Sequence, residues 1–250
     1  MSGVVVYVEH FPVRWVLLFA TCMAARAADQ PTTAPADAAL GQKLTQIDQR
    51  AGHIKSLSAN FDQQKFTALL RKPLDSSGRV RISGSVVRWD TTQPEASVLL
   101  IDQGEAKVYY PTQKTLEIYP LDKRLADLAA SPLPRLEVLK SRFAIEQIPV
   151  EAMDKSAAGK AFIALRLTPK DPSLAEHVKQ VRVLLDGSQA YIMKAEVTDG
   201  DGDRTVLSFK DVQLNADVGD LALVVPPGTA VSHPLEGLDG QAPQSQGSSK

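Results

Sequence analysis

Most of the chain consists of short stretches in which apolar and polar residues alternate. The stretch Leu57–Gln63 is the first, with Leu57, Ala59 and Phe61 at its apolar positions. A period of two is typical of a β-strand with one buried face. The pattern recurs at residues 80–82, 87–89, 108–110, 116–119, 162–169, 178–186, 191–199 and 204–215, and residues 98–101 are apolar on both faces. The chain is therefore expected to fold around a sheet of many short strands.

Turn-forming residues separate these stretches. In the first half they lie at Ser77-Gly78, Gln93-Pro94, Gln103-Gly104 and Pro111-Thr112. In the second half, Asp186-Gly187 and the run Asp199–Asp203 predict hairpin turns. Consecutive short strands joined by tight turns indicate an antiparallel sheet.

Helical periodicity is confined to two regions. Leu40, Leu44, Ile47 and Ala51 recur at helical spacing, and Gly52 ends the pattern. Helical spacing returns in the middle of the chain, interrupted by two prolines, at Leu125, Leu128, Ala129, Leu136, Leu139 and Phe143. An antiparallel sheet with helices only at the start and in the middle is an α+β domain.

The first 27 residues have the pattern of a secretory signal peptide. Arg14 precedes the apolar run Trp15–Ala24, and Ala25-Arg26-Ala27 supplies an A-x-A cleavage site. We expect cleavage after Ala27, or one residue later, and a mature protein in the periplasm. An uncleaved anchor is the alternative that this pattern leaves open.

The remaining sequence divides into a linker, one domain and a tail. Residues 28–39 are polar and contain prolines, residues 40–231 form a single domain, and residues 232–250 are predicted to be disordered. The only cysteine, Cys22, lies in the leader, so the mature chain forms no disulfide. Acylation of Cys22 is the less favoured interpretation, because Thr21 stands where a small residue is expected.

Charge and motifs argue against several classes of function. The 28 basic and 29 acidic residues nearly balance, and no basic block indicates nucleic acid. His53, His177 and His233 are far apart and form no metal-spaced pair. The run Asp199–Asp203 does not fit a calcium loop, because Arg204 occupies the glycine position. No nucleophile elbow, phosphate loop or dinucleotide fingerprint occurs. We therefore expect no enzyme and no cofactor.

Large aromatic residues at alternating strand positions are the remaining feature. Phe61, Trp89 and Tyr110 either fill a core or line the interior of a sheet that is curled far enough to hold a ligand. The pattern alone leaves both interpretations open.

An ordered set of short motifs resembles the periplasmic outer-membrane lipoprotein carrier family, the LolA type. The set covers residues 40–231 and comprises LSANFDQ, SGRVRI, RWDTTQPEASVLLIDQG, VYYP, LRLTP, VTDGDGDRTVLSFKDVQLN and VVPPGTAV. The most specific part is W-x-x-x-Q-P, from Trp89 to Pro94, followed by a strand, a turn and an aromatic strand.

The resemblance implies a strongly curved, incompletely closed antiparallel β-barrel with helices covering an apolar cavity. It also implies a carrier that accepts lipoprotein acyl chains from an inner-membrane ABC-type releasing complex and passes them to an outer-membrane acceptor lipoprotein. We expect a monomer. Alternatives are the same fold binding another lipid or glycolipid, an envelope-stress lipid sensor, and an exported hydrolase with a dispersed site.

The residues expected to line the cavity are Leu57, Phe61, Val80, Ile82, Val87, Trp89, Leu99, Ile101 and Tyr110. Of the neighbouring Tyr109 and Tyr110, one is expected to share the cavity with Trp89 and the other to pack outside, because successive strand residues face opposite sides. The family commonly places a lid-latching arginine before the tryptophan strand. The matching stretch here is Ser83-Gly84-Ser85, and Arg88 lies beside Trp89 instead.

Overall fold

The structure is a computed structural model, and it describes residues 35–121, 132–134, 136–157 and 161–234. Within these residues, twelve strands form a single sheet. They are β1 Ser56–Phe66, β2 Leu74–Ser83, β3 Val86–Gln93, β4 Ser97–Asp102, β5 Glu105–Tyr110, β6 Thr115–Pro120, β7 Phe143–Ile148, β8 Phe162–Pro169, β9 Val178–Asp186, β10 Tyr191–Asp199, β11 Arg204–Leu214 and β12 Ala230–Ser232.

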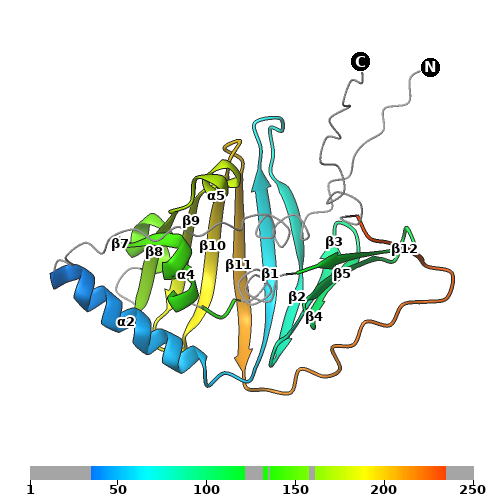
Figure 1. Cartoon of the computed structure of the whole chain (residues 1–250), viewed down its shortest axis with the longest axis horizontal. Helices are drawn as coiled ribbons and strands as arrows, with labels where there is room; N and C mark the ends of the chain where they lie inside the picture. Colours follow the sequence, from blue (N-terminus) through cyan, green and yellow to red (C-terminus); the bar gives the residue numbers. More distant parts are fainter. Residues whose placement is uncertain (1–34, 122–131, 135, 158–160, 235–250) are drawn as a thin grey trace, which may run out of the picture.

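Two antiparallel meanders make up the sheet. Strands β1 to β6 pair in sequence order, β7 to β11 do the same, and β1 pairs with β11 to join the two series. The short β12 adds to β6 in parallel, with Val231 opposite Leu116. The sheet is therefore mixed, whereas a wholly antiparallel one was predicted. It is open and curved, with β12 and β7 at its edges (Figure 1).

The helices of the described residues are α2 Pro35–Ala51, α4 Leu136–Arg142 and α5 Pro172–His177, with 3-10 turns η1 Val150–Ala152 and η2 Lys155–Ala157. Helices α2 and α4 lie together against β8 to β10 (Figure 1). The backbone N–H of Leu136, the first residue of α4, donates to Asp48 Oδ1 of α2 at 2.9 Å. One helix thus satisfies an amide that the start of the other leaves without a partner within its own helix.

A buried cluster fixes these helices on the sheet. We call it the helix-covered cluster: Leu44, Ile47, Ala51, Leu136, Phe143, Leu165, Leu167, Leu174, Val178, Val183, Leu185, Ala190 and Val197. Leu165 and Leu167 of β8 alternate along their strand, as do Val183 and Leu185 of β9, so one face of these strands meets the apolar faces of α2 and α4. That helices also cover a cavity stays a prediction.

Most predicted turns are confirmed, and one is wrong. Asp186 and Asp199 each accept backbone N–H groups in the two predicted hairpin turns, for example from Asp203 to Asp199 Oδ1 at 2.9 Å. Ser77-Gly78 lies inside β2 instead, at a shift of the pairing with β3. A Cβ on Gly78 would stand 2.0 Å from the Asp90 carbonyl oxygen. The glycine therefore allows two strands to approach closely at a bulge, and it does not form a turn.

Element boundaries differ from the prediction at both helical regions. Helix α2 begins at Pro35, inside the predicted linker, because proline is tolerated in a first turn and the following alanines favour helix. Phe143, predicted to be helical, opens β7 opposite Pro169. It still packs in the same cluster as Leu136, which explains the shared apolar spacing. Strand β7 and helix α5 were not predicted.

Several predictions fall outside the described residues. They are the signal peptide at 1–27, most of the linker at 28–39, the helical positions Leu125, Leu128 and Ala129, and the tail beyond Pro234. Within the described part of the chain, no helix is both long and apolar enough to cross a membrane.

Candidate ligand-binding face

All nine residues predicted to line a cavity lie in one buried cluster on one face of the sheet. We call it the strand cluster: Leu57, Ala59, Phe61, Val80, Ile82, Val87, Trp89, Leu99, Ile101, Ala106, Val108, Tyr110, Tyr119, Leu121 and Phe209. Every member belongs to β1–β6 or β11 except Leu121, which follows β6. No helix of the described residues contributes to it.

The strand register explains how these residues meet. Directly opposite residues on neighbouring strands point to the same face. One row across the sheet runs Leu57, Ile82, Val87, Ile101, Ala106 and Tyr119. The next row runs Ala59, Val80, Trp89, Leu99 and Val108. Alternation along five consecutive strands therefore produces one continuous apolar surface.

Trp89 lies at the centre of an aromatic group within this cluster. Its ring centroid is 4.9 Å from that of Phe61, in an edge-to-face arrangement, and 5.8 Å from that of Phe209. These separations fall in the range that favours aromatic pairs. Phe61 and Phe209 are opposite each other on β1 and β11, so this group also connects the two meanders. Phe209 was not predicted, although it sits at an alternating position of its strand.

Tyr109 and Tyr110 point to opposite faces of β5. Tyr110 is in the strand cluster together with Trp89, whereas Tyr109 pairs with Val98 and Leu116 on the other face. Both rings are buried. Whether the face that carries Trp89 and Tyr110 lines a cavity stays a prediction.

A polar group stands at the β6 edge of the same face. Glu117 lies opposite Val108, and its Oε2 accepts the Tyr119 hydroxyl at 2.8 Å and the Tyr110 hydroxyl at 3.5 Å. Burial, followed by the nearby Glu117 carboxylate, raises the pKa of both tyrosines well above the ordinary value. Both hydroxyls therefore stay protonated to a higher pH than the hydroxyl of an exposed tyrosine. Sequence reasoning missed Glu117, although it alternates with Leu116 and Ile118 in β6.

The described residues carry no group of three or more histidine, cysteine or acidic side chains placed to hold a metal ion. The strand cluster offers apolar area, with two tyrosine hydroxyls and one carboxylate at its β6 edge. Such a surface is suited to hold an apolar or amphiphilic ligand by burial.

The family of outer membrane lipoprotein carrier protein LolA matches residues 52–222. The chain belongs to this family. An outer-membrane lipoprotein carrier protein from Chromohalobacter salexigens is 23% identical over 207 residues, which cover 82% of this chain and 89% of that protein.

Two solved structures are similar over most of their length. An uncharacterized conserved protein from Thermus thermophilus is 11% identical, covers 78% of this chain and 99% of its own, and has a TM-score of 0.49. A LolA superfamily protein from Nitrosomonas europaea is 14% identical, covers 70% of this chain and 93% of its own, and has a TM-score of 0.37.

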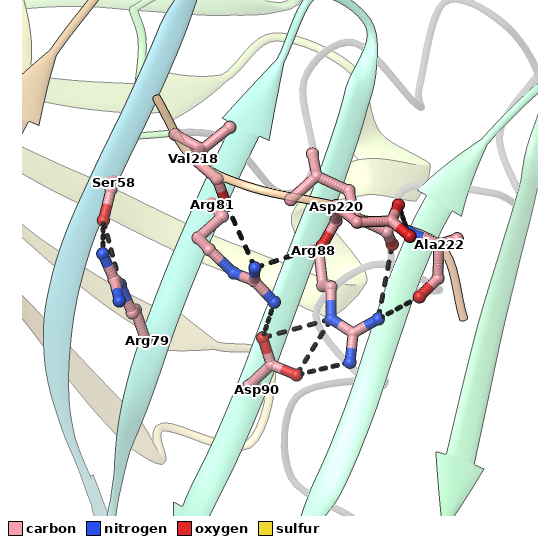
Figure 2. A network of polar contacts seen from close by, with 9 residues as sticks. Ser58, Arg79, Arg81, Arg88, Asp90, Val218, Asp220 and Ala222 are labelled. Atoms are coloured by element: carbon pink, nitrogen blue, oxygen red, sulfur yellow. Dashed lines mark hydrogen bonds and ion pairs between the residues drawn. The ribbon is translucent and has the colours of Figure 1, made fainter. Parts of the chain in front are cut away.

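The arginines of this LolA-family chain near Trp89 lie on the opposite face of the sheet. Arg81 Nη2 donates to Asp90 Oδ2 at 2.9 Å, and Arg88 Nε donates to Asp90 Oδ1 at 2.9 Å (Figure 2). Burial raises the pKa of Asp90, but hydrogen bonds and charges from Arg88 and Arg81 outweigh it and leave the pKa below its usual value. In the stretch Ser83-Gly84-Ser85, Ser83 ends β2, and Gly84 and Ser85 form the turn to β3.

These arginines hold the segment that follows β11. Arg81 Nη1 donates to the carbonyl oxygens of Val218 and Asp220, each at 3.2 Å, and Arg88 Nη1 donates to that of Ala222 at 2.5 Å (Figure 2). The segment thus crosses β2 and β3 before β12 joins β6. Arg88 therefore points to the face of the sheet opposite the strand cluster, where it binds the segment that follows β11.

Proposed function

We propose that this LolA-family protein is a periplasmic carrier that binds the acyl chains of lipoproteins on the face of the strand cluster and moves them from the inner to the outer membrane. The observation that carries the proposal is the continuous apolar surface of β1–β6 and β11, to which no described helix contributes. The function named for the family and for the Chromohalobacter relative supports it.

The energetics suit this role. An exposed lipid anchor costs about 0.8 kcal/mol for each methylene group, so acyl chains cross water only when a protein covers them. The apolar rows through Trp89 supply area along several strands. Tyr110, Glu117 and Tyr119 supply hydrogen-bonding groups at one edge of that area, where the polar part of an amphiphile is accommodated. A carrier needs only to bind and release its cargo, so no catalytic step is proposed.

Transfer across the envelope needs partners on both sides. We propose that an inner-membrane ABC-type releasing complex supplies the acylated cargo and that an outer-membrane acceptor lipoprotein receives it. Export through residues 1–27 as a cleaved signal peptide, with cleavage after Ala27, belongs to the same proposal. N-terminal sequencing of protein from the periplasm tests the export step, and a mature chain that begins at an acylated Cys22 would contradict it.

Purification from the native envelope, followed by mass spectrometry of the bound molecules, tests the cargo. Co-purified lipoproteins are the expected result. Free lipid or glycolipid alone would replace the lipoprotein cargo with another amphiphile. A protein that carries no amphiphile and does not bind a fluorescent fatty-acyl probe would contradict the carrier function altogether.

A further inference from the structure

The hairpin between β1 and β2 exposes apolar side chains at its tip. Leu69 is 92% exposed, Leu70 46% and Leu74 43%. Among the described residues only Val224 and Val231 are further large hydrophobic side chains with such exposure. The hairpin extends past the ends of the neighbouring strands (Figure 1). Three leucines within six positions therefore lie at a projecting point of the molecule.

The base of this hairpin is fixed to the sheet. Gln64 Nε2 donates to Asp75 Oδ1 across the two strands at 3.0 Å. Lys65 Nζ is 3.9 Å from Asp203 Oδ2, and the Arg204 guanidinium lies 4.2 Å from the centroid of the Phe66 ring. At the tip itself, the Leu70 N–H donates to the Thr67 carbonyl oxygen at 3.2 Å. The exposed leucines are thus presented by an ordered support.

Charge identifies the partner of this tip. Arg71 and Lys72 directly follow the leucines, both are exposed, and residues 67–74 contain no acidic residue. Asp75 and Asp203 contact Gln64 and Lys65 at the base of the hairpin. Apolar side chains next to cations match the boundary between acyl chains and anionic head groups of a bilayer.

We propose that residues 67–74 form a membrane-contacting tip, in which Leu69 and Leu70 enter the interface of a bilayer that contains anionic phospholipid while Arg71 and Lys72 contact its head groups. Two leucines and two cations give weak, reversible binding, since stable anchoring takes stronger signals. The inference depends only on the exposed hairpin and holds whether or not the strand cluster carries acyl chains.

Vesicle co-sedimentation of the purified full-length chain tests the tip. The vesicles are phosphatidylcholine alone and an equimolar mixture with phosphatidylglycerol. Leu69→Asp is compared with Val224→Asp, which places the same charge at a residue that is 81% exposed outside the hairpin. We expect binding to the anionic vesicles that added salt weakens, a loss of about tenfold or more for Leu69→Asp, and a change within about twofold for Val224→Asp.

The cations are tested separately by the double variant Arg71→Gln/Lys72→Gln. It should lose about tenfold or more of its affinity for the anionic vesicles and change little toward phosphatidylcholine. Equal binding by Leu69→Asp and Val224→Asp would overturn the proposal. Wild-type protein that binds neither vesicle would also overturn it and would leave a protein as the occupant of the tip. Fatty-acyl probe affinity, measured in parallel, reports on the carrier function alone.

Discussion

Strands β8 and β9 bury their apolar face against helices α2 and α4, whereas no helix of the described residues joins the cluster on strands β1 to β5. The helix-covered cluster draws residues from α2, α4 and α5 as well as from the strands. Among the described residues, the strand cluster draws on strands and on Leu121, and its largest members are aromatic. Both sets of strands show the same alternation in sequence. Within the part of the chain that the structure describes, the difference is that helices contribute to one cluster and not to the other.

The two clusters meet at β10. Ile192 packs against both, and its backbone N–H donates to the Pro132 carbonyl oxygen at 2.7 Å. One continuous face of the sheet thus carries two different clusters, one on each side of β10. Where helices fill it, the face is an ordinary core. Where it carries the large aromatic rings and the tyrosine–carboxylate group, it is the surface proposed to accept a ligand.

The substitution Leu165→Ala disrupts packing in the helix-covered cluster and has the largest expected effect on stability. Leu165 is fully buried in β8 within that cluster. Truncation removes packed methyl groups and leaves a void, so the free energy of unfolding should fall by about 2–5 kcal/mol. Denaturant unfolding measures the loss, and affinity of the folded fraction for a fatty-acyl probe should not change.

The same truncation at an exposed leucine gives the control. Leu69→Ala removes an equal side chain that is 92% exposed, so its unfolding free energy should stay within about 0.5 kcal/mol of the wild type. A loss at Leu165 no larger than that at Leu69 would show that the helices do not pack on β8 as described.

Trp89→Ala probes the other half. If the strand cluster accepts acyl chains, part of the contact area of Trp89 is supplied by ligand. The loss of stability should then fall well below the ~3–5 kcal/mol typical of a packed core aromatic. Probe affinity should drop instead, because the ring contributes apolar area to the chain that it touches. Unfolding and probe titration on one preparation measure both quantities.

Tyr109→Ala is the matched control for Trp89→Ala. Tyr109 is a buried aromatic on the opposite face of the same part of the sheet, 8% exposed against 7% for Trp89. Its truncation should lower stability and leave probe affinity unchanged in the folded fraction. Full-sized destabilisation by Trp89→Ala with unaltered affinity would refute the assignment of Trp89 to the ligand, while family membership would stand.

The sheet was largely predictable because alternation is a local signal. Hairpin turns at Asp186-Gly187 and Gln103-Gly104 could be located for the same reason. Strand β12 could not, since three residues with a parallel partner at β6 leave no periodic trace. Helix α5 is likewise too short for periodicity, although Asp171 and Pro172 form a recognisable start, with the Asp171 carboxylate accepting the Ser173 N–H at 2.9 Å.

The candidate site was predicted in its apolar part and missed in its polar part. Trp89 and its neighbours follow from alternation and from the family resemblance. Glu117 was overlooked because a glutamate in an alternating strand is normally assigned to solvent, and only the register with Val108 shows which face it occupies. Gly78 was assigned to a turn because its close contact with the Asp90 carbonyl comes from another strand.

Replacing Tyr110 and Tyr119 by phenylalanine sharpens the comparison at the polar edge of the strand cluster. Near neutral pH the free energy of unfolding of the double variant should fall by only about 1–2 kcal/mol, the usual net value of two hydrogen bonds.

At alkaline pH the stability of the wild type and that of the double variant should depend differently on pH. In the unfolded chain both hydroxyls ionise near the ordinary pKa of 10.0, whereas burial keeps them protonated to higher pH in the fold. Above about pH 10 the wild type therefore loses stability with every rise in pH, because the unfolded state holds fewer protons. The variant lacks these two groups and should show a shallower decline, while Tyr191, whose pKa is also raised, contributes equally to both. Unfolding free energies measured from pH 7 to pH 11 decide the matter. Parallel declines for the two proteins would mean that Tyr110 and Tyr119 are open to water in the fold, and the polar edge of the proposed ligand surface would have to be redrawn.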